Sequence, residues 1–186
     1  MDTSIFYTKA RRGFLMLLSC LLWSLYPDEA AAQDRFGTAH NFAEAGVYKE
    51  FDYRHSYLTS LEAGREYDVH WNFRLGGAVH MYSFGNRDYS TLGLGLRPTV
   101  KFFFLRHERF SLFAEVKGGV IYMLPQYPNL AINYTFTGGL GSELPLGRVH
   151  RIRFGAGYNH FSNGRRWAEG HNPMWDGLGG YIGWVF

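Results

Sequence analysis

Three polar residues near the end of the chain carry the side chains needed for nucleophilic attack on an ester. Ser162 and His160 stand two residues apart, and Asp176 follows after a short connecting segment. A serine hydroxyl is a weak nucleophile until an imidazole takes its proton, and a carboxylate orients that imidazole. The residue types therefore predict a nucleophile, a base and an orienting acid. Glu169 is a rival acid, but it stands in the connecting segment, where nothing fixes its direction.

The segments on either side of this connection are predicted to be β-strands. In 152–162 and in 176–186 the even-numbered positions are mostly apolar. Ser162, His160 and Asp176 are even-numbered and therefore share one apolar face. The strands must run antiparallel because a short loop joins them, so the three residues meet at one end. A flush pairing would place Ser162 opposite Asp176. It would make His160 a diagonal neighbour of Asp176, at about 7–8 Å.

The same alternation recurs along the chain in segments of about ten residues. Eight segments can be distinguished, starting near Ala43, Tyr57, Trp71, Leu92, Phe110, Ile132, Ile152 and Asp176. One face is rich in Leu, Val and aromatic residues, and the other carries Gly and charges of both signs. A soluble sandwich would also alternate, but the charged face favours the narrow polar lumen of a membrane barrel. The sequence thus predicts an all-β fold, an eight-stranded antiparallel transmembrane β-barrel.

The alternation also predicts which side chains lie inside and outside this barrel. Side chains fill the interior of eight strands, so a wide pore is not expected. The charged residues predicted to pair in the lumen are Arg74, Arg97, Lys101, Lys117, Glu62 and Glu115, and His80 also faces it. We interpret these charges as structural rather than as a ligand site. The side chains predicted to face outward include Leu94, Phe102, Val116, Tyr134, Phe154 and Tyr158.

The beginning of the chain differs from the rest. A basic start, an apolar run and a small-residue cleavage site follow one another at Lys9–Arg12, Gly13–Tyr26 and Ala30–Ala32. This order is typical of a secretory signal peptide, and a transmembrane helix needs a longer run of roughly 20 apolar residues. We expect residues 1–32 to be cleaved and 33–186 to form the barrel, with an uncleaved N-terminal anchor as the alternative. Cleavage removes Cys20, the only cysteine, which excludes disulfides and cysteine catalysis.

Composition excludes several other classes of function. The net charge is only +3, with no clustered basic stripe, so we expect no nucleic-acid partner. No group of His, Asp and Glu has zinc-ligand spacing, and a serine triad needs no metal or other cofactor. Histidines interpreted as interfacial or surface residues are His40, His55, His70, His107, His150 and His171.

The C-terminal motif resembles that of the lipid A 3-O-deacylases, the PagL family. The resemblance lies in His160-Phe161-Ser162-Asn163-Gly164 and Asn172-Pro173-Met174-Trp175-Asp176, and it covers about residues 158–186. The family motif is His-x-Ser-Asn followed by Gly or Ala, a short loop, and then Asn-x-Gly-x and an acidic residue. This chain has Asp where the family has Glu and Met174 where it usually has Gly, and its loop is about two residues longer.

The resemblance implies an eight-stranded outer-membrane barrel whose catalytic triad faces the membrane. Ser162 would be the nucleophile, His160 the general base and Asp176 the orienting acid. Asn163 and Gly164 would lie at the oxyanion hole, where donors stabilise the tetrahedral intermediate.

From this we expect hydrolysis of an acyl ester of lipid A, the lipid part of lipopolysaccharide, at the 3-O position. Lipid A lies in the outer leaflet, so the 163–175 loop would be extracellular and both mature termini periplasmic. Two alternatives remain, a non-enzymatic barrel for adhesion or envelope integrity and a barrel lipid acyltransferase. The sequence leaves open the chain-length preference and whether the protein forms a homodimer.

Overall fold

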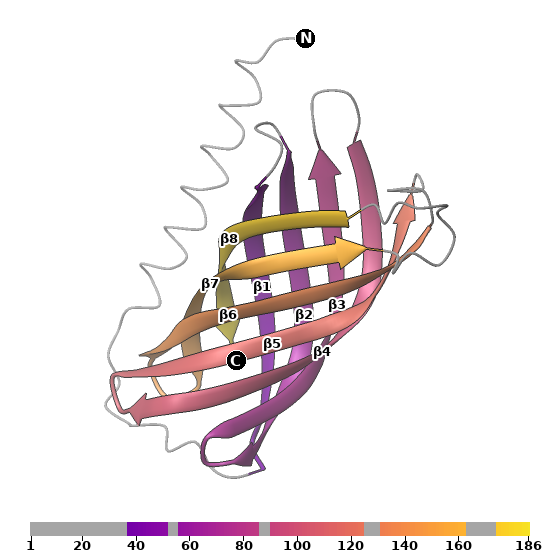
Figure 1. Cartoon of the computed structure of the whole chain (residues 1–186). Coiled ribbons are helices and arrows are strands. Elements are labelled where there is room, and N and C mark those ends of the chain that lie inside the picture. Colours follow the sequence, from indigo (N-terminus) through magenta and orange to yellow (C-terminus); the bar gives the residue numbers. More distant parts are fainter. Residues whose placement is uncertain (1–36, 52–55, 86–89, 125–130, 163–173) are drawn as a thin grey trace, which may run out of the picture.

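The computed structural model describes residues 37–51, 56–85, 90–124, 131–162 and 174–186, and these form a closed β-barrel. The strands are β1 (Ala39–Glu50), β2 (Tyr57–His70), β3 (Phe73–Gly85), β4 (Ser90–His107), β5 (Phe110–Leu124), β6 (Ile132–Leu146), β7 (His150–Ser162) and β8 (Met174–Val185). Each strand pairs antiparallel with the next, and β1 pairs with β8 to close the sheet (Figure 1). The predicted eight-stranded antiparallel barrel is confirmed.

The strands begin near the predicted positions, with small differences at their ends. β1 begins at Ala39 rather than near Ala43, because the first residues of β1 pair with the end of β2. β3 begins at Phe73 because Trp71 and its successor form the turn from β2. The predicted signal peptide, residues 1–32, lies outside the described residues. Among the described residues, no helix is long and apolar enough to cross a membrane.

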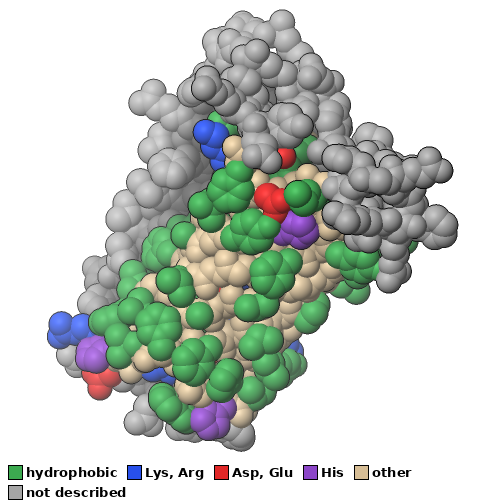
Figure 2. All heavy atoms as spheres, viewed as in Figure 1, with side chains coloured by type: hydrophobic (Ala, Val, Ile, Leu, Met, Phe, Trp, Pro, Cys, Tyr) green, Lys and Arg blue, Asp and Glu red, His purple; other side chains and the backbone are tan. Residues whose placement is uncertain are grey.

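The outer surface of the barrel is apolar. Five of the six residues predicted to face outward are between 39% and 59% exposed. These are Leu94, Phe102, Val116, Tyr134 and Phe154. Tyr158, the sixth, is partly exposed. Figure 2 shows one side of the barrel, where hydrophobic side chains are spread over the face and few charged side chains lie among them. Such a belt is the surface that a transmembrane barrel presents to hydrocarbon, so the outward predictions are confirmed.

The interior carries a dense network of ion pairs, as predicted. All six lumen charges named from the sequence are buried, and so is His80. Arg153 joins several acids of the network. One guanidinium nitrogen lies 2.5 Å from Glu44, and the other lies 2.7 Å from Glu66 and 2.6 Å from Glu143. Burying a charge is costly unless an opposite charge accompanies it, so this network fills the lumen with mutually dependent side chains.

One end of the interior is apolar instead, which the sequence reasoning did not predict. This inner apolar cluster lies where the chain passes from β1 to β2, β3 to β4, β5 to β6 and β7 to β8. Its buried members are Tyr48, Leu58, Tyr82, Phe84, Ile121, Met123, Phe161 and Trp175. A barrel of eight strands is narrow enough for these side chains to fill it. The cluster therefore supports the strand ends that carry the candidate site.

Candidate active site

The pairing of β7 with β8 brings the predicted residues together on the outer surface. His160 lies directly opposite Asp176, and Ser162 lies opposite Met174. The predicted flush pairing of Ser162 with Asp176 was therefore wrong, because the actual pairing is shifted by two residues. A shift of two leaves every side chain on its original face, so alternation could not distinguish the two registers. Direct pairing also suits Asp176, whose side chain is one methylene shorter than the Glu of the family motif. Opposed side chains start closer together than diagonal ones.

A continuous chain of hydrogen bonds links the three residues. His160 Nδ1 lies 2.8 Å from Asp176 Oδ1, and His160 Nε2 lies 3.1 Å from Ser162 Oγ. A carboxylate can only accept hydrogen bonds, so Nδ1 carries the proton of the neutral ring and donates a hydrogen bond to Asp176. The lone pair of Nε2 is then left to accept the hydrogen bond from the serine hydroxyl. This tautomer is the one that a histidine base requires.

Tyr158 is a fourth member of the site that the sequence reasoning missed in this role. Its hydroxyl donates a hydrogen bond to Asp176 Oδ1, the oxygen that also accepts from His160. The Tyr158 ring stacks on Phe51 on one side and on His160 on the other, each with centroids 6.3 Å apart. The sequence did contain a signal for this role: Tyr158 is even-numbered and stands two residues before His160, which places it on the same face. The three rings thus form a stack beside the Asp–His pair.

The strand residues between the triad positions point inward and join the inner apolar cluster. Phe161 and Trp175 are opposed across β7 and β8 and stack with centroids 6.0 Å apart. Phe84 meets both rings edge-on, at 5.8 and 6.0 Å. The indole nitrogen of Trp175 also donates to Ser56 Oγ at 3.1 Å. These contacts fix the backbone that carries the outward residues.

The site lies within the apolar outer surface. The side chains of His160 and Asp176 are 27% and 22% exposed, and Ser162 is only 7% exposed. On either side of Ser162, its cross-strand neighbours Tyr134 and Met174 are 40% and 55% exposed. In Figure 2 an acidic side chain and a histidine meet within a surface of hydrophobic side chains. The imidazole and the carboxylate are therefore partly open toward the membrane side, whereas Ser162 itself is buried beside them.

The remaining predicted residues have mixed outcomes. Asn163 and Gly164, predicted for the oxyanion hole, and the rival acid Glu169 lie outside the described residues. His40 was predicted to be interfacial, and this was wrong. It is buried, with Nε2 2.6 Å from Asp68 Oδ2, because β1 begins early enough to turn it into the lumen. In the described part of the chain, no group of three or more His, Cys, Asp or Glu side chains is placed to hold a metal ion.

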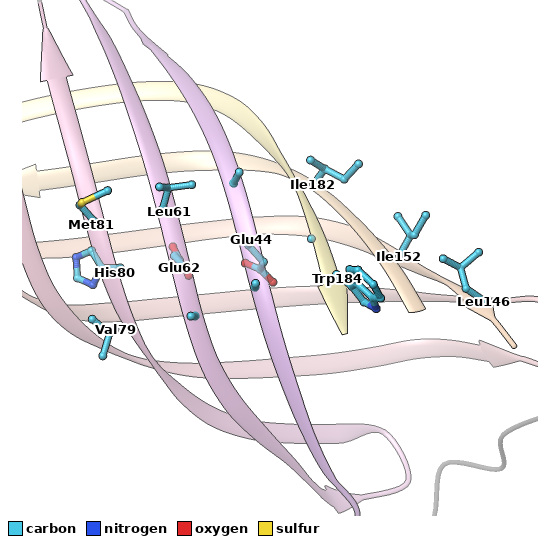
Figure 3. A pocket seen from close by; sticks show the side chains of 14 residues that line it. Glu44, Leu61, Glu62, Val79, His80, Met81, Leu146, Ile152, Ile182 and Trp184 are labelled. Carbon is cyan, nitrogen blue, oxygen red and sulfur yellow. The ribbon is translucent and has the colours of Figure 1, made fainter. Parts of the chain in front are cut away.

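A separate hollow of about 540 Å³ lies against β1, β2, β3, β7, β8 and the end of β6. Small side chains such as Ala43 and Ala63 contribute to it, together with Leu61, Ile182 and Trp184. Figure 3 shows these larger apolar side chains, with Glu44 and Glu62 of the lumen network close by. None of the triad residues lines this hollow. The chemistry of the candidate site therefore does not depend on it.

Comparisons with known proteins concern the fold. No protein-family model and no curated protein sequence matches the chain. The crystal structure of the outer membrane protein OprG from Pseudomonas aeruginosa is similar, with a TM-score of 0.50 and 11% identity over 85% of this chain and 99% of that chain. A structure from the de novo design of transmembrane β-barrels aligns with a TM-score of 0.44 and 14% identity, covering 82% of this chain and 96% of that one. The chain has the fold of a small outer-membrane barrel.

Proposed function

We propose that this outer-membrane barrel is a serine esterase that hydrolyses an acyl ester of lipid A. The observation that carries the proposal is the hydrogen-bonded series Asp176, His160 and Ser162 on the lipid-facing surface. Polar side chains facing hydrocarbon cost free energy, although the cost falls to about 0–1 kcal/mol near the interface. Three such residues in the order acid, imidazole and hydroxyl are better explained by chemistry than by stability. The ester linkages of a glycolipid lie at this interfacial depth.

In the proposed reaction, His160 Nε2 takes the proton of Ser162 Oγ while Oγ attacks the ester carbonyl carbon. The tetrahedral intermediate collapses, His160 returns the proton to the departing sugar oxygen, and an acyl group remains on Ser162. Water then attacks the acyl-enzyme with His160 again as the base. A fatty acid leaves and the serine hydroxyl is restored. Asp176 stays ionised throughout and stabilises the imidazolium that forms in each half-reaction.

A non-enzymatic barrel, used for adhesion or envelope integrity, is the second candidate. The ion-pair network and the inner apolar cluster occupy the lumen, as in a rigid structural barrel, and the similarity to OprG, which concerns the fold alone, agrees with it. This candidate predicts that lipid A composition does not depend on Ser162. The acyltransferase alternative predicts that another lipid gains the acyl chain that lipid A loses.

The test is mass spectrometry of lipid A from cells that express the full chain or its Ser162→Ala variant. The wild type should remove one acyl chain, and Ser162→Ala should slow this by roughly 10⁶-fold, as expected when a triad loses its nucleophile. Purified protein should release the free fatty acid from lipid A in detergent micelles. Release without any acylated second lipid would separate hydrolysis from acyl transfer.

The matched control is Ser142→Ala. Ser142 also faces outward, on the neighbouring strand β6, but it pairs with Phe154 far from the imidazole. It should keep full activity, and heat-modifiable gel migration should show that both variants fold. Unchanged lipid A in cells with a folded wild-type barrel would reject the esterase and leave the structural barrel.

A further inference from the structure

Lys49 is a cation on the apolar outer face of β1. It is exposed, and its cross-strand neighbours are Leu178 of β8 and Tyr57 of β2. These two side chains are 54% and 47% exposed. Along the chain, the next outward residues on either side are Val47 and Phe51, which are 55% and 56% exposed. Lys49 is thus surrounded on all four sides by outward apolar side chains.

Nothing described in the structure neutralises this charge. No acidic side chain of the described residues forms an ion pair with Lys49. By register the nearest acid on this face is Asp176, its diagonal neighbour, and that carboxylate is engaged by His160 and Tyr158. A lysine on a lipid-facing surface is costly unless its ammonium group reaches the interface or meets an anion. The anions at the membrane interface are the phosphate groups of lipids.

We propose that Lys49 binds a phosphate group of the glycolipid whose ester lies at Ser162, and so selects phosphorylated lipid A as substrate. This inference rests on the proposed function. By register Lys49 is level with Leu178 and Tyr158, so it lies two strand spacings across and four residues along from Ser162, a Cα separation of about 16 Å. A phosphorylated disaccharide headgroup and an extended lysine side chain can together bridge that span. A compact ammonium donates to phosphate without demanding one fixed geometry, which suits a headgroup that must also present its ester to the triad.

Binding to the Ser162→Ala barrel tests this without turnover. The detergent-solubilised protein is titrated by native mass spectrometry with bisphosphorylated lipid A, with the same lipid after phosphatase treatment, and with phosphatidylglycerol. Lys49→Ala in this background should weaken binding of bisphosphorylated lipid A about fivefold, the effect of one basic residue at an anionic surface. Lys49→Arg should retain binding. The preference for phosphorylated over dephosphorylated lipid A should disappear in Lys49→Ala.

The matched control is Arg65→Gln, an exposed outward cation toward the opposite end of β2. Its loss should leave the binding preference intact. Unchanged binding of lipid A by a folded Lys49→Ala variant would overturn the proposal. Equal weakening for phosphatidylglycerol would overturn it too, because Lys49 would then be a general contact for anionic lipids. Failure of the wild type to hydrolyse lipid A would reject the esterase without affecting the binding result.

Discussion

Tyr158→Phe is the substitution that best separates the geometry of the triad from its chemistry. It removes the hydroxyl that donates to Asp176 Oδ1 and keeps the ring that stacks between Phe51 and His160. The carboxylate then has His160 as its remaining partner among these residues and can rotate more freely. This change therefore perturbs the orientation of the imidazole and leaves the nucleophile itself intact.

The size of the effect follows from the hydrogen bond that is lost. A hydrogen bond to a charged group contributes about 1.5–3 kcal/mol. The Asp176 side chain is 22% exposed, so water can partly replace the missing donor and the lower end applies. About 1.5 kcal/mol corresponds to roughly a tenfold fall in kcat. The freed carboxylate also becomes a stronger acceptor for His160, which opposes the loss, so tenfold is an upper bound. KM should stay unchanged, because the Tyr158 hydroxyl donates its hydrogen bond to Asp176 and not to the substrate.

The assay is fatty acid release from lipid A micelles, with kcat and KM measured separately. Tyr122→Phe is the control, since Tyr122 is a 50% exposed outward tyrosine on β5. In an Asp176→Ala background, Tyr158→Phe should have no further effect, because its partner is gone. A loss above about 100-fold would show that Tyr158 takes part in the reaction directly. An effect of the same size in both backgrounds would refute the positioning role.

Two further substitutions test the acid and the lumen. Asp176→Ala should lower kcat by about 10⁴-fold, as in other Ser-His-Asp triads, while heat-modifiable migration stays normal; activity near the wild-type value would mean that another acid, with Glu169 as the candidate, orients His160. Arg153→Met should destabilise the barrel by about 3–5 kcal/mol in urea titration, because Glu44, Glu66 and Glu143 lose their shared cation. The control Arg148→Met changes an exposed turn residue and should have little effect; equal stability of the two variants would contradict the structural role of the network.

The fold could be predicted because a two-residue period fixes which face each side chain joins. Arg97 and Lys101 are inward and Leu94 and Phe102 outward, as their spacing required. In a strand without a bulge the face depends only on parity, so a strand whose ends are misjudged by a few residues still has its faces assigned correctly. The bulge between Phe103 and Leu105 reverses this parity at the end of β4, where Leu105 is exposed and Arg106 turns inward to Asp68. His40 shows where this fails, because it was left outside the predicted first strand and so was given no face.

The register of β7 against β8 could not be predicted in this way. Pairing His160 with Asp176 and pairing Ser162 with Asp176 satisfy the same alternation. What distinguishes them is packing in the interior, where the observed register stacks Phe161 on Trp175. That contact involves side chains that the polarity rule does not anticipate. Near the ends of β3, β5 and β7 the inward positions are also apolar, so polarity no longer identifies the lumen.

The inner apolar cluster and the outward triad both follow from the alternation of side chains along β7 and β8. Alternation that turns His160 toward lipid necessarily turns Phe161 into the barrel, and the same holds for Asp176 and Trp175. The imidazole–carboxylate distance is set by the strand spacing and by the register, and the stacked Phe161 and Trp175 rings hold that register from inside. Under the proposed function, a lipid substrate would approach from the membrane side, away from the inner groups that fix the site. An apolar interior beneath the triad is therefore compatible with the proposed hydrolysis on the outer face.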